Sequence, residues 1–215
     1  MNHALDPLPN EQNLPEPIRV MRAESWQWEV LAKAFLTDDI LNYWLGEKTD
    51  ENVLKDFFEA VIKDALTSKG FIFSIPDQSV VFIWMRHAYN LEPPGEWKKR
   101  WYGILGPEGL KRYYSLYEAG DMQIDPALLE KSMLPEYIGI LPASQSLGYG
   151  SYIGKWAFNY FDERGYESPY ILASSRRAAK HYCPLLGFHV HKEVLLTEGE
   201  DGPAAIFLKR NEPGR

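Results

Sequence analysis

Residues 137–166 have the sequence YIGILPASQSLGYGSYIGKWAFNYFDERGY, and this stretch decides the fold of the 215-residue chain. Tyr137–Leu141 is a short apolar run that predicts a strand, and Pro142 ends it because proline has no N–H to donate to a sheet. Residues 145–150 then form a loop with two glycines. From Tyr152 onward, apolar side chains recur at the spacing of one helix face. The stretch therefore predicts a strand, a glycine-containing loop and a helix.

Such a loop is suited to binding an anion. The first N–H groups of a helix have no partner within it, and the helix dipole adds partial positive charge at that end. Glycines at 148 and 150 remove side chains that would keep an anion away from these N–H groups. A phosphate or pyrophosphate is the expected ligand.

Two common glycine-rich phosphate motifs do not match this loop. The Walker motif ends in Gly-Lys-Ser/Thr, whereas this loop has Gly-Tyr-Gly-Ser. The dinucleotide fingerprint is closer, because Gly148, Gly150 and Gly154 form G-x-G-x-x-x-G. However, that fingerprint begins where its strand ends, and residues 142–147 intervene here. An ordinary strand-to-helix turn remains the structural alternative.

A third pattern matches better. Ile140-x-Pro142-x-x-Gln145-x-x-Gly148-x-Gly150 resembles the V-x-P-x-x-Q/R-x-x-G-x-G/A motif of the GNAT acyltransferases. Downstream, residues 173–188, ASSRRAAKHYCPLLGF, resemble a second block of the same family.

The second block departs from the family pattern at two positions. Ala179 and Tyr182 match the family's Ala and Phe, but Arg177 replaces the usual Asn and Cys183 the usual Tyr. Residues 195–209 are similar to the ending of the subgroup that contains puromycin N-acetyltransferase. Residues 47–130 carry no family motif, so the acceptor is the least predictable part of the function.

The resemblance implies transfer of an acetyl group from acetyl-CoA to the primary amine of a small molecule, by direct attack and without a metal. The pantetheine arm would lie beside the 136–141 strand and the thioester between this strand and the next, near Tyr170–Ala173. The residues implied in acetyl-CoA binding are Ile140, Leu141, Gln145, Ser146, Leu147, Gly148, Tyr149, Gly150, Ser151 and Arg177. Trp44, Trp84 and Trp101 are expected in the acceptor pocket, although most tryptophans are simply core residues.

Three side chains are candidates for proton transfer. Relatives use a Tyr on the helix before Gly-Phe as general acid; here either Cys183 or a shifted Tyr182 occupies that region. Both can equally be core residues. Glu136 is the candidate base, acting through water. The alternative interpretation is that Glu136 is only an exposed carboxylate at the end of a strand.

A backbone N–H near Leu141 is expected to stabilise the oxyanion. Cys183 as an acylated nucleophile with His181 is disfavoured, because residues i and i+2 of a helix do not face each other.

Composition sets broad limits on the function. The net charge is −7 and there is one cysteine, Cys183, so we expect no internal disulfide and a reducing, cytoplasmic location. No basic stripe indicates a nucleic-acid partner, and no apolar run is long enough to span a membrane.

Lysines, arginines and aromatics gather at residues 96–118, where a solvated helix face is the preferred interpretation. His189 and His191 have metal-like spacing but no evident third ligand. A monomer or homodimer is expected.

The remaining patterns predict one domain over residues 18–215, preceded by a flexible arm at 1–17. Helices are expected to begin near Ser25, Asp38 and Asp50 and to span 96–118 with a break at Gly106-Pro107. Strands are expected at 18–21, 71–75, 80–85, 169–172, 187–196 and 204–209. The fold class is therefore α/β (α+β), with a mixed, mostly antiparallel sheet flanked by helices.

Two other functions remain open. A non-catalytic acyl-CoA-binding module would explain Arg177 and Cys183 as traces of lost chemistry. A nucleotide-dependent oxidoreductase is a more distant alternative and would require NAD binding.

Overall fold

The structure is a computed structural model that describes residues 14–46, 49–68, 70–86, 95–197 and 202–211, except the side chains of residues 95–98 and 101. Most of the expected N-terminal arm thus lies outside the described residues. Its last part is held against the protein, because Pro17 is buried and Leu14 packs on a hydrophobic cluster.

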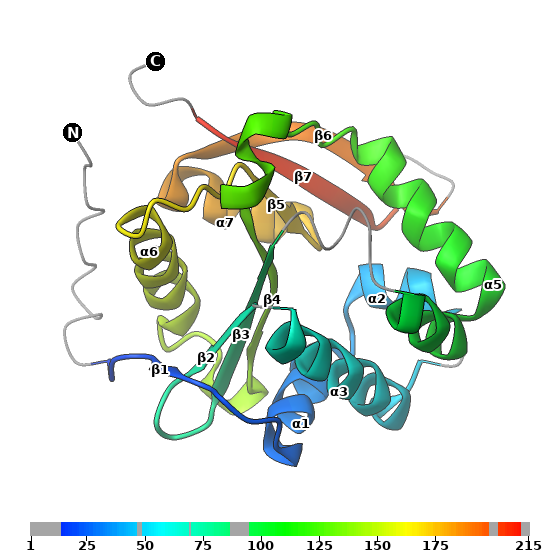
Figure 1. Cartoon of the computed structure of the whole chain (residues 1–215), viewed down its shortest axis with the longest axis horizontal. Helices are drawn as coiled ribbons and strands as arrows, with labels where there is room; N and C mark the ends of the chain where they lie inside the picture. The colour runs from blue at the N-terminus through cyan, green and yellow to red at the C-terminus, as the bar shows by residue number, and fades with distance from the viewer. Residues whose placement is uncertain (1–13, 47–48, 69, 87–94, 198–201, 212–215) are drawn as a thin grey trace.

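Two antiparallel sheets form the centre of the molecule (Figure 1). The first has the order β1-β2-β3-β4, and its strands are β1 (Ile18–Arg19), β2 (Phe71–Ser74), β3 (Val80–Arg86) and β4 (Met133–Ile140). The second has the order β5-β7-β6, with β5 (Tyr170–Ala173), β6 (Phe188–Leu195) and β7 (Ala204–Arg210). The last of the described strands, β7, is thus the middle strand of its sheet. The mixed, mostly antiparallel architecture, flanked by helices, confirms the fold class expected from the sequence.

Helices cover both faces of the sheets. In Figure 1, α6 lies on the opposite side of β3 and β4 from α1 and α3. The helix α5 lies beside α2 and α3 and extends to β6. The helices are α1 (Ser25–Ala34), α2 (Asp39–Leu45), α3 (Glu51–Thr67), α5 (Gly95–Gly120), α6 (Tyr149–Asp162) and α7 (Arg176–Leu186), with short 3₁₀ turns η3 (Pro126–Lys131) and η4 (Pro142–Ser144). Among the described residues, no helix is long and apolar enough to cross a membrane.

Two hydrophobic cores result, one on each face of the sheets. Successive residues of a strand point to opposite faces. In β3, Ile83 accordingly packs with α1 and α3, whereas Phe82 and Trp84 pack with α6. The same division occurs in β7, where Phe207 faces the first core and Ile206 the second. This explains why both strands are continuous apolar runs: each is covered on both sides.

Local sequence determines most helix boundaries. Asp38 and Asp50 each accept two backbone N–H bonds and cap α2 and α3 as expected. The cap of α1 is Glu24 rather than Ser25, in a reciprocal arrangement with Gln27. The expected break in 96–118 is a kink at Gly106, whose φ of 66° is unfavourable for residues with a side chain.

The two sheets meet at one end only. A single parallel bridge joins Ser132 to Glu167, with Met133 N–H donating to the Glu167 carbonyl at 2.7 Å and Glu167 N–H to the Lys131 carbonyl at 3.0 Å. Beyond this bridge, β4 pairs with β3 and β5 pairs with β7, and the two strands are not paired with each other. A gap therefore opens between β4 and β5.

Asp64 of α3 holds the N-terminal half of α5 in place. Its buried carboxylate forms an ion pair with Arg100, while its second oxygen has no hydrogen-bond partner among the described residues. Burial raises the pKa of Asp64 to about 6, and the Arg100 guanidinium only partly offsets this effect. The carboxylate therefore destabilises the folded state when it is charged.

This arrangement predicts an unusual pH dependence of stability. The folded state holds the Asp64 proton more tightly than the unfolded state, so the contribution of Asp64 to the free energy of unfolding falls as pH rises from about 4 to 6. We expect Asp64→Asn to match the wild type near pH 4.5 and to exceed it at pH 7.5, by roughly 1–3 kcal/mol. Urea unfolding at the two pH values measures this. Asp56→Asn, an exposed site on the same helix, is the control, and equal pH slopes in all three proteins would contradict the prediction.

Candidate active site

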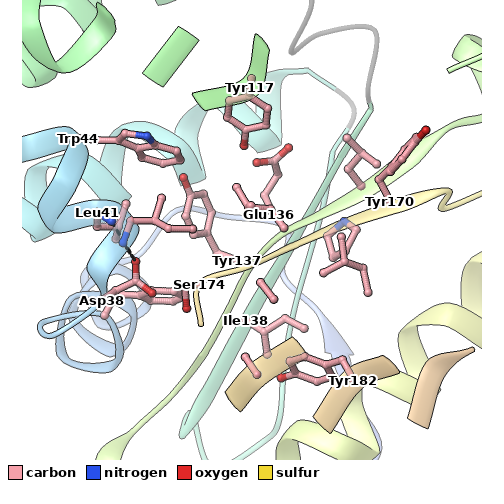
Figure 2. A pocket seen from close by; sticks show the side chains of 18 of the residues that line it. Asp38, Leu41, Trp44, Tyr117, Glu136, Tyr137, Ile138, Tyr170, Ser174 and Tyr182 are labelled. Atoms are coloured by element: carbon pink, nitrogen blue, oxygen red, sulfur yellow. Dashed lines mark hydrogen bonds between the residues drawn. The ribbon is translucent and has the colours of Figure 1, made fainter. Parts of the chain in front are cut away.

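The gap between β4 and β5 contains a cavity of about 190 Å³ (Figure 2). One wall comes from residues 134–138 of β4 and another from residues 170–173 of β5. Trp44 of α2 and Tyr117 of α5 line one end, and Tyr182 of α7 lines the other. The fold thus brings five separate elements of the chain to one site.

A β-bulge presents Glu136 to this cavity. In the β3–β4 ladder Ile83 pairs with Tyr137 and Trp84 with Pro135, so Glu136 is the extra residue of the bulge. Bulges of this kind bend a strand and redirect a side chain. In Figure 2 the Glu136 carboxylate and the Tyr117 hydroxyl point toward each other. The candidate base therefore lies in the strand, not at an exposed strand end.

The backbone of β4 offers hydrogen-bonding groups to the gap beyond the bulge. Leu141 N–H donates to the Ser79 carbonyl at 2.9 Å, so it is directed toward β3. Because peptide groups alternate in direction along a strand, the N–H groups of Ile138 and Ile140 face the gap. The N–H of Leu141 itself is thus not available to an oxyanion, and the nearby N–H groups that face the gap are those of Ile138 and Ile140.

The glycine-containing loop follows at the same end of β4. Gln145 donates its side-chain amide to the Ile140 carbonyl at 3.2 Å, which ties the loop to the strand. Ser146 and Gly148 have φ values of 68° and 92°, and Gly148 is the N-cap of α6. The chain thereby turns so that α6 begins directly beside the end of β4.

A second, open cavity connects this loop with the first. It shares Phe35, Asp38, Ile138 and Ser174 with the inner cavity and continues to Ile140 and Gln145. The two cavities therefore form a passage from the loop into the gap.

The structure distinguishes the two candidate acids on α7. Tyr182 lines the inner cavity, and a Cβ added to Gly150 would lie 3.7 Å from its hydroxyl oxygen. Burial raises the pKa of Tyr182, which keeps its hydroxyl protonated at neutral pH. Cys183 does not line the cavity and packs against the second core, where burial raises the pKa of its thiol.

Asp38 is a residue that the sequence analysis treated only as a helix start. It lines both cavities, accepts the N–H groups of Ile40 and Leu41 at 3.0 Å, and lies against Ser174 at the end of β5. Burial raises its pKa, with Ser174 and the backbone bonds opposing the shift. Only the tertiary structure brings Asp38 to the gap, because no nearby sequence motif marks it.

Three tryptophans were expected in the acceptor pocket, and their positions differ. Trp44 lines the inner cavity. Trp84 does not: it is fully buried on the opposite face of β3, with its ring stacked 4.4 Å from that of Phe161. It points away from the gap because its β3 position alternates to the α6 side. The side chain of Trp101 is outside the described residues.

Three other expected residues have different surroundings. The ring of Tyr149 is buried in the second core, with its hydroxyl 3.5 Å from Asp77, so only its backbone N–H is near the loop. Arg177 is exposed in the first turn of α7 and lines neither of the two cavities described above. Ser151 is buried at the start of α6, and its hydroxyl lies 3.0 Å from Nε2 of His181.

The two histidines of β6 contact other parts of the chain. His189 lies 2.8 Å from the Asn211 side chain, and His191 lies 3.2 Å from the Asp121 carbonyl. Within the described part of the chain, no cluster of three or more His, Cys, Asp or Glu residues is placed to hold a metal ion.

No protein-family profile matches the chain, and no curated protein matches it in sequence. Solved structures do match. An acetyltransferase from Corynebacterium glutamicum, described as histone acetyltransferase HPA2 and related acetyltransferase, has a TM-score of 0.61 and 20% identity over 94% of this chain and 99% of that chain.

Two further neighbours have similar coverage. The C-terminal condensation domain of Ebony, in complex with beta-alanyl-dopamine, has a TM-score of 0.64 and 10% identity over 90% of this chain and 96% of that chain. Arylalkylamine N-acetyltransferase 2 from Aedes aegypti has a TM-score of 0.56 and 12% identity over 89% of this chain and 97% of that chain. The chain has the GNAT acetyltransferase fold, as the two sequence blocks indicated.

The loop geometry predicts different effects of alanine at its two glycines. Gly148→Ala forces a side chain into a positive-φ conformation and should lower the free energy of unfolding by about 1–2 kcal/mol. At Gly150 an added Cβ makes only ordinary contacts, at 3.6 Å from Ile140 and 3.7 Å from Tyr182. Gly150→Ala should therefore be neutral or slightly stabilising. Urea unfolding of the pair measures the difference, and an equal loss in both variants would contradict the described loop.

Proposed function

We propose that this protein is an acetyl-CoA-dependent N-acetyltransferase that acts on a primary amine. The observation that supports it most is the passage from the glycine loop into the gap between β4 and β5, with Glu136 at a bulge inside it. A GNAT fold alone does not establish catalysis, because one fold can host several functions. The proposal therefore depends on what these residues can do chemically.

The donor is proposed to enter through the loop. Its pyrophosphate would bind the N–H groups of residues 146–151 at the start of α6, where the helix dipole favours an anion. Its pantetheine amides would pair with the peptide groups of Ile138 and Ile140, as an added strand pairs with a sheet edge. The acetyl thioester would then reach the inner cavity beside Tyr182.

Direct transfer requires no covalent enzyme intermediate. The neutral amine nitrogen attacks the thioester carbonyl carbon, and an N–H of β4 stabilises the developing oxyanion. As the C–N bond forms, Glu136 receives the excess amine proton through water. The C–S bond then breaks, and Tyr182 gives its proton to the departing thiolate. We favour Tyr182 over Cys183 because only Tyr182 lines the cavity.

The names of two structural neighbours are consistent with an amine acceptor. One is an arylalkylamine N-acetyltransferase, and the other was solved with beta-alanyl-dopamine, the amide of an aromatic amine. Their sequence identity to this chain is low, so they support the reaction class only.

Acetyl-CoA binding tests the donor site. Gly150→Glu adds a carboxylate that begins beside Ile140 and Tyr182 at the mouth of the gap. We expect calorimetry to show acetyl-CoA binding by the wild type and a loss of about 100-fold or more in the variant, because the charge opposes the pyrophosphate. Gly103→Glu, at an open position in α5, is the matched control and should bind normally. If the wild type does not bind acetyl-CoA, the proposed function is wrong.

Two conservative substitutions test the proton transfers. Glu136→Gln should lower kcat by roughly 100-fold, within the range usual for a general base. Tyr182→Phe should lower kcat by about 10-fold, since a thiolate is already a fair leaving group. Release of free CoA thiol measures both, and acetyl-CoA affinity should stay within about twofold of wild type. A full-rate Glu136→Gln variant would exclude Glu136 as the base. Acetyl-CoA binding without turnover of any amine would instead support a non-catalytic acyl-CoA-binding module.

A further inference from the structure

The inner cavity has two chemically different ends. The donor end, at Ile138, Ser174 and Tyr182, continues into the open cavity and the glycine loop. The opposite end is the acceptor end, which we define as the part where Figure 2 shows Trp44, Tyr117, Glu136, Tyr137 and Tyr170. Met122 also lines the cavity, and it precedes Gln123, whose carbonyl accepts the Tyr170 hydroxyl. A donor that enters through the loop leaves this end for the second substrate.

The acceptor end is largely aromatic. Trp44 is 2% exposed, and its ring is stacked on that of Tyr117 with centroids 6.2 Å apart and planes 26° from parallel. The ring of Tyr137, which also lines the cavity, packs edge-on against the rings of Phe35 and Phe58, with ring centroids 5.7 and 5.2 Å apart. Such walls offer flat apolar surfaces to a ring-shaped ligand.

These walls are held in place by contacts outside the cavity. Tyr170 donates its hydroxyl to the Gln123 carbonyl at 2.9 Å. The backbone carbonyl of Trp44 accepts a hydrogen bond from Arg112 at 3.1 Å. The pocket is therefore formed before the substrate binds, which lowers the entropy cost of binding.

The charges in the cavity favour a cation and oppose an anion. No lysine, arginine or histidine is among the described residues that line it, whereas Glu136 and Asp38 are. Asp38 already accepts two backbone N–H groups and lies on the donor side. Glu136 is close enough to Tyr113, Tyr117 and Tyr137 that its charge adds to the effect of burial in raising their pKa values. A substrate ammonium group would thus be attracted to Glu136, and a substrate carboxylate would be repelled.

The size of the cavity limits the substrate. Its volume is about 190 Å³, whereas a dry cavity of about 150 Å³ is enough for a benzene-sized ring. The acetyl group must share this space. One ring on a short arm fits, while a peptide or a long polyamine would have to remain outside.

We propose that the acceptor is a small primary amine with one apolar ring and no carboxylate, bound with its ring against the wall formed by Trp44, Tyr117 and Tyr137 and its amine at Glu136. This inference rests on the proposed function and makes it specific.

The test compares three small amines that differ in their ring and their charges. 2-Phenylethylamine carries a ring and one cation, phenylalanine adds a carboxylate, and 1,5-diaminopentane replaces the ring by a second cation. With the full chain and saturating acetyl-CoA, thiol release should give kcat/KM for 2-phenylethylamine about 10-fold or more above the other two, because an unpaired charge is costly to bury.

A matched pair of variants locates the effect. Met122→Trp fills the acceptor end and should lower kcat/KM for 2-phenylethylamine by about 10-fold or more, since the cavity no longer holds a ring. Met21→Trp, at a position 70% exposed, should behave as wild type. Acetyl-CoA binding, measured separately by calorimetry, should be unchanged in both.

The outcomes separate the two proposals. If acetyl-CoA binds but phenylalanine or the diamine is preferred, or Met122→Trp has no effect, the ring-amine inference is overturned and the proposed function stands. If acetyl-CoA binds but no amine is acetylated, the inference and the catalytic role both fail. If acetyl-CoA does not bind, the proposed function itself fails, and the inference fails with it.

Discussion

The arrangement of the site depends on β4 being paired along one edge only. At its start β4 is joined to the segment before β5 by the Ser132–Glu167 bridge, and from there the two strands separate. Unpaired strand edges are normally covered or blunted in soluble proteins, because they can pair with other chains. Here the edge faces a gap between two helix-covered sheets, so it is protected from other proteins and still open to a small ligand.

The bulge at Glu136 couples this edge to the chemistry. A regular ladder would alternate residues 135–138 strictly between the two faces, whereas the extra residue changes which side chains face the cavity. The same bend directs the later peptide groups of β4 along the passage. In the proposed mechanism, one irregularity thus serves both the binding of the donor by the backbone and the transfer of the proton. Because Pro135 lies next to the bulge and has no N–H, the local sequence is compatible with a break in the ladder.

The sequence predicted the elements that have strong local signals. The loop at residues 145–150, the capped starts of α2 and α3 and the apolar runs of β3 and β7 all depend on nearby residues. Residues whose role depends on distant neighbours were not predictable in this way. Trp84 was expected at the acceptor pocket but faces α6, because the face a β3 residue occupies depends on what covers each side of the sheet. The sequence predicts Asp38 only as the start of a helix. It belongs to the site because Ser174, which is distant in sequence, approaches it across the gap.

The central position of β7 has a consequence for how the protein is made. β5 and β6 precede β7 in the chain, yet each pairs only with β7. During synthesis both strands therefore remain unpaired, with exposed edges, until β7, the last of the described strands, has left the ribosome. Phe207 and Ile206 then complete the two cores at the same moment. Contacts between residues far apart in the chain form slowly and leave apolar surface exposed in the meantime. The nascent protein is thus most dependent on chaperones until β7 has been synthesised.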